Sequence, residues 1–209
     1  MVDPEGTAEI LKRALDYPYA TPERSFLYRD GEAHELPEGF DRTGRTPLIS
    51  YGANAAPSAL AVKLASLPGV ELPVLRAELE SFDVAYSAHV SPYGAVPATL
   101  VESPGAVAPV FVLHPTPEQL QLLSASELNY DLVEVEGAVA YRSKHGCLSI
   151  AGSAVALAAV RSRGRSLPEF DQAAVLERVR AAVEPELSLA EFVHACVERG
   201  GSEPLPPLT

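Results

Sequence analysis

The chain has 209 residues, of which 47% are hydrophobic and 21% charged, a composition typical of a folded globular protein. The 16 basic and 28 acidic side chains give a net charge of −12, which repels phosphate backbones and anionic lipids, so we expect neither nucleic acid nor a membrane as partner. The two cysteines, Cys147 and Cys196, form no C-x-x-C motif, and the first residues lack the basic start and apolar run of a signal peptide. We therefore expect a cytoplasmic location.

The first 47 residues are interpreted as an N-terminal arm. Apolar residues at helical spacing predict a helix over residues 7–16, with Thr7 as its N-cap. Proline and glycine interrupt every period over residues 17–45, which predicts irregular structure. The same stretch is rich in Tyr and Phe, so we expect the arm to pack on the body of the protein.

The middle of the chain is predicted to be rich in strands. Residues 48–51 read as a strand, 52–54 as a turn, and Pro57 as the first residue of a helix. Further strands are predicted over 72–77, 82–86, 97–102 and 107–113, the last two joined by a type II turn at residues 103–106. Thr116 and Gln119 match a capping box for a helix that runs to about Ser126.

The C-terminal part predicts more strands and two helices. Strands are expected over 132–135, 139–142 and 147–150, whereas the alanine-rich run 154–160 fits either a strand or a helix. A helix is predicted over 169–183, a second capping box at Ser188 and Glu191 opens the last helix, and the tail from Gly200 is expected to fray. The whole pattern predicts the α+β class.

The turn Tyr51-Gly52-Ala53-Asn54 follows an apolar strand and precedes a helix. Gly52 allows a positive φ angle and the close approach of a ligand, because glycine has no Cβ atom. Consecutive backbone N–H groups in such a turn form a site for anions, and the side chain of Asn54 adds a further donor. An ordinary tight turn explains the same local pattern.

Glu127 is the second candidate, because it stands between the end of a well-capped helix and the start of a strand. A carboxylate that projects into a cleft there has its pKa raised by burial and becomes a usable base. The alternative is an ordinary solvated glutamate.

Taken together, these motifs resemble the gamma-glutamylcyclotransferase-like family. The resemblance covers residues 48–141 and rests on the order of four features: the strand that ends in Y-G-x-N, the G-x-x-x-A-T-L segment at 94–100, the hairpin, and the helix that ends in L-x-x-x-E with a tyrosine nearby. It implies a small mixed β-barrel of that type with flanking helices and an N-terminal arm. Residues 48–141 are then the barrel, and residues 142–209 add strands and helices that complete the same domain.

The resemblance also implies a function. The loop Tyr51–Asn54, with Tyr130 nearby, binds a small molecule that carries a γ-glutamyl or another carboxylate group. Glu127 acts as general acid/base in an intramolecular cyclisation that releases 5-oxoproline, and neither a metal nor an organic cofactor is needed. Oligomeric state is left open.

The chain departs from the family pattern at three positions: Ala53 replaces a common serine, Ser124 an aspartate, and Leu128 a glycine. These departures favour an alternative, a non-catalytic carboxylate-binding or scaffolding protein on the same fold. Gly52, Asn54 and Glu127 favour the enzyme.

Other polar residues are weaker candidates. His145 and Cys147 lie two positions apart and fit a base–nucleophile pair on a strand, although Cys147 also fits a small core residue. The five histidines form no H-x-H or H-x-x-x-H pair for zinc. The basic run 161–165 fits a surface loop or a second anchor for an anionic substrate. Four glutamates fit solvated strand edges: Glu78, Glu80, Glu134 and Glu136. Three residues near Gly94 fit additional pocket residues: Ser87, Ser91 and Tyr93.

Overall fold

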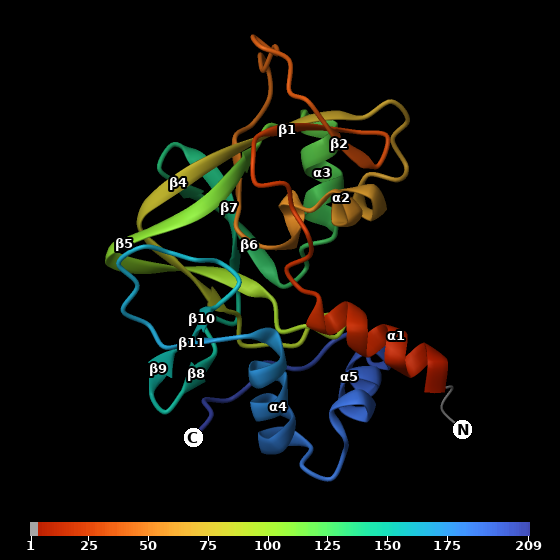
Figure 1. The fold of residues 1–209 in the computed structure, drawn as a ribbon, viewed down its shortest axis with the longest axis vertical. Coiled ribbons are helices and arrows are strands. Elements are labelled where there is room, and N and C mark those ends of the chain that lie inside the picture. The colour runs from red at the N-terminus through yellow and green to blue at the C-terminus, as the bar shows by residue number, and fades with distance from the viewer. Residues whose placement is uncertain (1–3) are drawn as a thin grey trace.

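Two long antiparallel strands, β4 (Glu71–Tyr86) and β5 (Ala98–Leu113), form the centre of the computed structural model, which describes residues 4–209 (Figure 1). They belong to a nine-stranded, mostly antiparallel sheet with the order β11-β10-β4-β5-β3-β7-β6, to which a hairpin of β1 and β2 is joined at β4. The described residues therefore form an α+β fold, as predicted. The other strands of the sheet are β1 (Phe26–Arg29), β2 (Glu32–His34), β3 (Leu48–Ser50), β6 (Tyr130–Val135), β7 (Ala138–Ser143), β10 (Ala156–Leu157) and β11 (Glu169–Phe170).

The predicted turn at residues 103–106 is wrong. Glu80 pairs with Val107 and Phe82 with Glu102, so residues 103–106 lie opposite Ser81 alone. This segment is a bulge in which Gly105 has a φ of 85° and Ser81 a φ of 62°. Both halves of β5 consequently pair with β4, whereas the sequence predicted that residues 107–113 would turn back beside residues 97–102.

The N-terminal arm is more regular than the sequence predicted. Helix α1 spans Pro4–Leu15, so Thr7 lies inside the helix and is not its N-cap. Strands β1 and β2 form a hairpin within the stretch predicted to be irregular, and β1 pairs with β4. Asp30 and Gly31 have φ angles of 52° and 84° in the turn between them, which suits a tight hairpin turn.

Helices α2 (Pro57–Lys63) and α3 (Pro117–Ala125) pack against one end of the sheet in a shared hydrophobic cluster (Figure 1). Pro57 begins α2, and the capping box of Thr116 and Gln119 begins α3, both as predicted. Leu60 from α2 and Leu123 from α3 are fully buried beside Leu48 of β3. The Gly52 turn follows β3 and Glu127 follows α3, so both candidates stand at the ends of elements that share one hydrophobic core.

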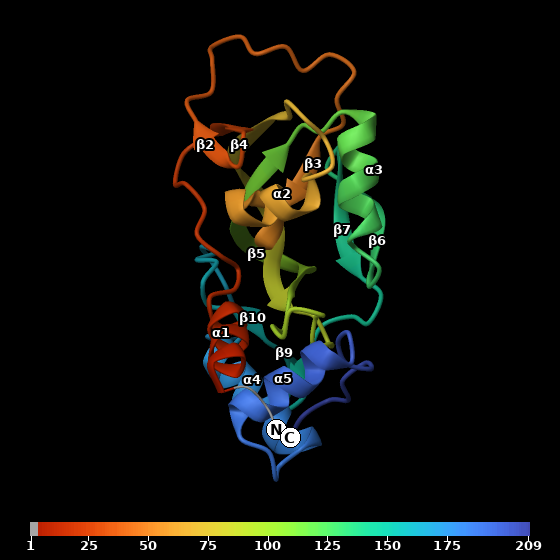
Figure 2. The ribbon, with the colours of Figure 1, turned by 90° about the vertical axis from the view of Figure 1, so that its right-hand side faces the viewer.

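Helices α4 (Gln172–Val183) and α5 (Leu189–Glu198) lie at the opposite end of the molecule beside α1, as Figure 2 shows. The helix predicted from residue 169 starts only after Asp171, because residues 169–170 are strand β11. Asp171 is the N-cap, and its side chain accepts a hydrogen bond from the N–H of Ala174. The capping box of Ser188 and Glu191 is confirmed. Two short strands, β8 (Ser149–Ile150) and β9 (Ser153–Ala154), form a separate hairpin. Residues 154–160 contain the end of β9, strand β10 and a turn, and no helix.

The prediction that the tail after Gly200 frays is also wrong. Leu205 and Leu208 are buried, and their N–H groups donate to the carbonyls of Ala88 and Ser149. Within residues 4–209, no helix combines the length and hydropathy of a membrane span.

A buried ion pair connects β4 to the loop that carries the basic run 161–165. The carboxylate of Asp83 is fully buried, and Arg165 donates to both of its oxygens at 2.9 Å. Burial alone favours protonation of Asp83, but the hydrogen bonds from Arg165 and Ser162 outweigh it and lower the pKa of this carboxyl group.

We expect Arg165→Met to destabilise the protein by about 3–5 kcal/mol, because it leaves the Asp83 carboxylate buried without a counter-charge. The measurement is the free energy of unfolding in urea. Arg163→Met is the matched control: Arg163 lies on the same loop as Arg165 and pairs with Glu78 of β4, but this pair is exposed, so the variant should change stability little. The double variant Asp83→Asn/Arg165→Met should recover part of the loss, and equal effects of Arg163→Met and Arg165→Met would contradict this account.

Candidate functional site

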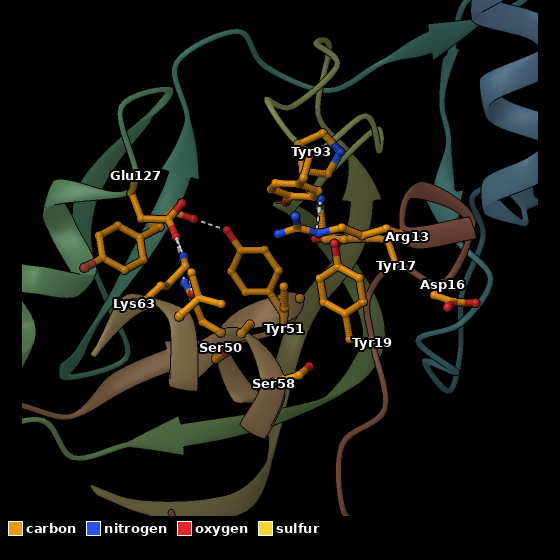
Figure 3. Close-up of a pocket in the computed structure, with 18 of the residues that line it drawn as sticks. Arg13, Asp16, Tyr17, Tyr19, Ser50, Tyr51, Ser58, Lys63, Tyr93 and Glu127 are labelled. Atoms are coloured by element: carbon orange, nitrogen blue, oxygen red, sulfur yellow. Dashed lines mark hydrogen bonds and ion pairs between the residues drawn. The ribbon is translucent and has the colours of Figure 1, made fainter. Parts of the chain in front are cut away.

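A cavity of about 520 Å³ lies between α1, the turn after β3, and the end of α3 (Figure 3). Tyr51, Gly52, Ala53 and Asn54 line it from the turn, and Glu127 and Tyr130 line it from the segment between α3 and β6. The two main candidates predicted from the sequence, the turn and Glu127, therefore line one cavity together with Tyr130. Most of the chain's eight tyrosines also line it: Tyr17, Tyr19, Tyr51, Tyr93, Tyr130 and Tyr141.

The turn after β3 presents backbone donors. A short 3-10 helix over Ala53–Ala55 follows Gly52, and the first N–H groups of a helix have no acceptor within it. Among the described residues, none accepts a hydrogen bond from the N–H of Gly52, Ala53 or Asn54. Ser50, immediately before the turn, is buried, and its hydroxyl makes no hydrogen bond to any described residue.

Gly52 is needed for a different reason from the one expected. Its φ angle is −134°, outside the left-handed region. A Cβ atom at this position would lie 2.5 Å from the hydroxyl oxygen of Tyr17. The close approach therefore involves a tyrosine of the N-terminal arm, and the same hydroxyl accepts a hydrogen bond of 2.8 Å from the N–H of Ala98.

Glu127 forms a closed polar triangle with Asn54 and Lys63. Asn54 Nδ2 donates to Glu127 Oε1 at 3.0 Å, Lys63 Nζ donates to Asn54 Oδ1 at 2.6 Å, and Lys63 Nζ also pairs with Glu127 Oε1. The side chains of Lys63 and Glu127 are 19% and 12% exposed, so most of this ion pair is shielded from water. Figure 3 shows the Lys63 and Glu127 side chains directed toward each other.

The tyrosine hydroxyls around this triangle are neutral donors. Burial raises the pKa of Tyr51 and Tyr130, and the negative charge of Glu127 adds to the increase. Tyr51 donates to the carbonyl of Tyr141, and Tyr130 donates to the carbonyl of Ala98 at 2.9 Å. Burial likewise raises the pKa of Tyr141 to about 12, and its hydroxyl is hydrogen-bonded to Ser124. Ser124 therefore helps to fix the wall of the cavity, while Leu128 is 77% exposed.

Several cavity residues were not identified from the sequence. Lys63 lies on α2 with no motif around it, and α1 contributes one polar face, namely Glu9, Lys12, Arg13 and Asp16. The only available signal was indirect: aromatic residues in the arm indicated packing on the body, and Tyr17 and Tyr19 are among them.

A buried histidine lies behind Tyr130. His89 is 1% exposed, its Nδ1 is 2.7 Å from Ser87 Oγ, and its ring centroid is 5.1 Å from that of His145. Burial lowers the pKa of His89 to about 4, and the proximity of His145 contributes. His145 Nε2 lies 3.2 Å from Asn129 Oδ1, and no hydrogen bond joins His145 to Cys147 among the described residues. The structure thus gives no support to a Cys–His pair.

The remaining candidates lie elsewhere. Arg163 and Arg165 pair with Glu78 and Asp83, so the basic run does not reach the cavity as a second anchor. Glu78, Glu80, Glu134 and Glu136 are exposed, as expected for strand edges. Of Ser87, Ser91 and Tyr93, only Tyr93 lines the cavity. No group of three or more His, Cys, Asp or Glu side chains within residues 4–209 is placed to hold a metal ion.

Comparisons with known proteins add no assignment. No protein-family model matches this chain, and no match is found among curated proteins or among solved structures.

The contact between Gly52 and Tyr17 generates one expectation. Gly52→Ala should cost about 1–3 kcal/mol, because the new methyl group displaces the Tyr17 hydroxyl. Tyr17→Phe should cost about 1–3 kcal/mol, because it leaves the buried N–H of Ala98 without its acceptor. Since both changes break the same contact, the double variant should cost less than the sum by more than about 0.5 kcal/mol in urea unfolding. Strict additivity would show that the two sites are independent.

A second expectation concerns His89 and pH. The folded protein binds a proton at His89 with a pKa of about 4, below the ordinary value of 6.5, so the unfolded chain takes up this proton first as pH falls. Stability should therefore decrease from about pH 6.5 down to about pH 4, and His89→Asn should remove part of that decrease. Urea unfolding at half-unit pH steps measures the difference from wild type. His34→Asn, at a half-buried histidine on strand β2, is the control, and a pH profile of His89→Asn identical to that of the wild type would refute the assignment.

Proposed function

We propose that this protein is a gamma-glutamylcyclotransferase-like enzyme that cyclises a γ-glutamyl amide and releases 5-oxoproline and an amine. The observation that carries the proposal is the meeting of Glu127 with the Tyr51–Asn54 turn in one cavity, through the 3.0 Å hydrogen bond from Asn54 to Glu127. These residues lie 73 positions apart in the sequence. They carry the motifs on which the resemblance to that family rests.

In the proposed reaction, the unpaired N–H groups of the turn hold the glutamyl head group and stabilise the oxyanion. The α-nitrogen of the substrate attacks the γ-carbonyl carbon of the same molecule, a C–N bond forms, and the original amide C–N bond breaks. Confining the chain in a curled conformation supplies effective molarities of about 10⁵ M or more in well-oriented cases.

Glu127 is the proposed proton carrier. The α-ammonium group loses two protons in all and keeps one as the ring N–H, and the leaving nitrogen receives both. Glu127 accepts and returns these protons in turn, so that the reaction balances without water and without an oxidant. Lys63 and Asn54 both contact Oε1 of Glu127, so together they fix the position of the carboxylate beside the turn.

The proposal also covers the type of barrel and the cellular location. The sheet around β3, β5 and β7, together with the segments on either side of it, is taken to be a small mixed barrel of the same family type, with residues 142–209 completing one domain. The thiols of Cys147 and Cys196 are free, which suits a reducing cytoplasm.

A second candidate function is a non-catalytic protein that binds small carboxylates. The contacts of Glu127 favour it, because Oε1 of the carboxylate already accepts hydrogen bonds from Asn54 and Lys63 within the protein. Ala53 and the exposed Leu128 point the same way. The two functions differ in turnover, which a single assay measures.

The deciding experiment is an assay of 5-oxoproline release from a panel of γ-glutamyl peptides and amines. We expect turnover by the wild type and a loss of at least about 10²-fold in Glu127→Gln, which keeps the shape of the side chain but removes its basicity. Glu118→Gln is the matched control, because Glu118 is an exposed glutamate in the first turn of α3, the helix that precedes Glu127.

Lys63→Gln separates a positioning role from a structural one. It should weaken binding of the glutamyl head group more than it slows turnover at saturation, since it loosens Glu127 and Asn54 together. If the wild type releases no 5-oxoproline from any compound, the binding protein is the better reading. If Glu127→Gln is as active as the wild type, Glu127 is not the proton carrier.

A further inference from the structure

The arm side of the cavity is built by one face of α1. Glu9, Lys12, Arg13 and Asp16 line the cavity at helical spacing, while Ala14 on the opposite face is fully buried in the core. Lys12 Nζ pairs with Asp16 at 2.7 Å, and Lys63 at the far end pairs with Glu127. Arg13 forms no ion pair with any described residue, not even with Glu9 one turn earlier.

Arg13 points into the cavity. Figure 3 shows its side chain extending from α1 past Tyr93 and Tyr19 in the direction of Tyr51. The centre of its guanidinium group lies 5.9 Å from the ring centroid of Tyr93. A guanidinium fork that has no carboxylate partner among the described residues suits the carboxylate of a ligand, to which it donates two parallel hydrogen bonds.

Three packed rings form the wall beside Arg13. Tyr17 and Tyr93 are stacked with centroids 6.1 Å apart, and Tyr19 meets Tyr17 edge to face at 5.9 Å. The hydroxyl of Tyr19 is buried beside Arg13: burial raises the pKa of Tyr19 and the guanidinium group of Arg13 opposes that rise, although no hydrogen bond of normal geometry joins the hydroxyl to a described residue. Tyr19 and Arg13 thus place two polar groups together in the cavity, and the ring faces beside them favour an apolar or aromatic ligand.

The cavity thus has two different polar ends with an aromatic wall between them. Glu127, Asn54 and Lys63 form one end, and Arg13 with Tyr19 forms the other. Resting on the proposed function, we propose that α1 and the Tyr17–Tyr19 segment form the subsite for the leaving amine, and that this subsite selects an aromatic amino acid. Its carboxylate pairs with Arg13, its ring packs against Tyr19 and Tyr93, and the γ-glutamyl head group lies at the Glu127 end.

The test compares three substrates by their kcat/KM for 5-oxoproline release: γ-glutamyl-phenylalanine, γ-glutamyl-phenethylamine, which lacks the carboxylate, and γ-glutamyl-alanine, which lacks the ring. Wild type should prefer the first to each of the others by about tenfold or more. Arg13→Gln should abolish the preference over phenethylamine, and Tyr19→Leu should reduce the preference over alanine.

Arg178→Gln is the matched control. Arg178 is also an exposed helical arginine over an aromatic ring, 4.8 Å from the centroid of Phe170, but it lies on α4 away from the cavity. This variant should keep both preferences of the wild type.

Binding measured by calorimetry with the same compounds separates the two proposals. Turnover of all three substrates at equal efficiency, unchanged by Arg13→Gln, would overturn the subsite and leave the proposed function standing. Absence of turnover would overturn the proposed function. The subsite would then stand if γ-glutamyl-phenylalanine binds the wild type and loses about tenfold in affinity in Arg13→Gln, and it would fall if the two proteins bind it equally.

Discussion

The pairing of β4 with β5 is the constraint on which the rest of this structure depends. The two strands pair from Val74 and Leu113 at one end to Tyr86 and Ala98 at the other, and they cross from one hydrophobic cluster to the other. β1 and β10 pair with β4, and β3 pairs with β5. The remaining strands of the nine-stranded sheet join it through these three, so this ribbon positions the whole sheet. Ala98, the last paired residue, is held by hydroxyls of Tyr17 and Tyr130, which places the floor of the cavity at the end of the ribbon.

Local chemistry explains which elements were predictable. The capping boxes at Thr116 and Ser188 and the proline at 57 act within one helical turn, and all three helix starts were predicted correctly. The Asp30-Gly31 turn is equally local and was present in the sequence as a hairpin signal, but the surrounding prolines and glycines obscured it. Proline and glycine at 104 and 105 gave the opposite error, because a bulge and a turn use the same residues. The choice between them is made by pairing with β4, which is not a local property.

The same difference between local and non-local signals decides which residues of the candidate site were predictable. The Tyr51–Asn54 turn and Glu127 each stand at the end of a regular element, and this position is visible in the sequence. Lys63 and Arg13 lie within helices with ordinary composition, and only their distance in space from Glu127 and Tyr93 makes them notable. Gly52 shows the difference most clearly. The sequence indicated a glycine that permits close approach, but not that Tyr17, 35 positions earlier, is the group that approaches.

One contact far from the cavity bears on how sequences related to this one would look in an alignment. A Cβ atom at Gly164 would lie 2.2 Å from the carbonyl oxygen of Gly105, because the loop after β10 rests on the bulge of β5 backbone to backbone. Position 164 would then stand out as an invariant glycine between the exposed Arg163 and the Arg165 that pairs with Asp83. Such invariance on a surface loop is usually taken as a sign of ligand binding, whereas here it would record two main chains in contact.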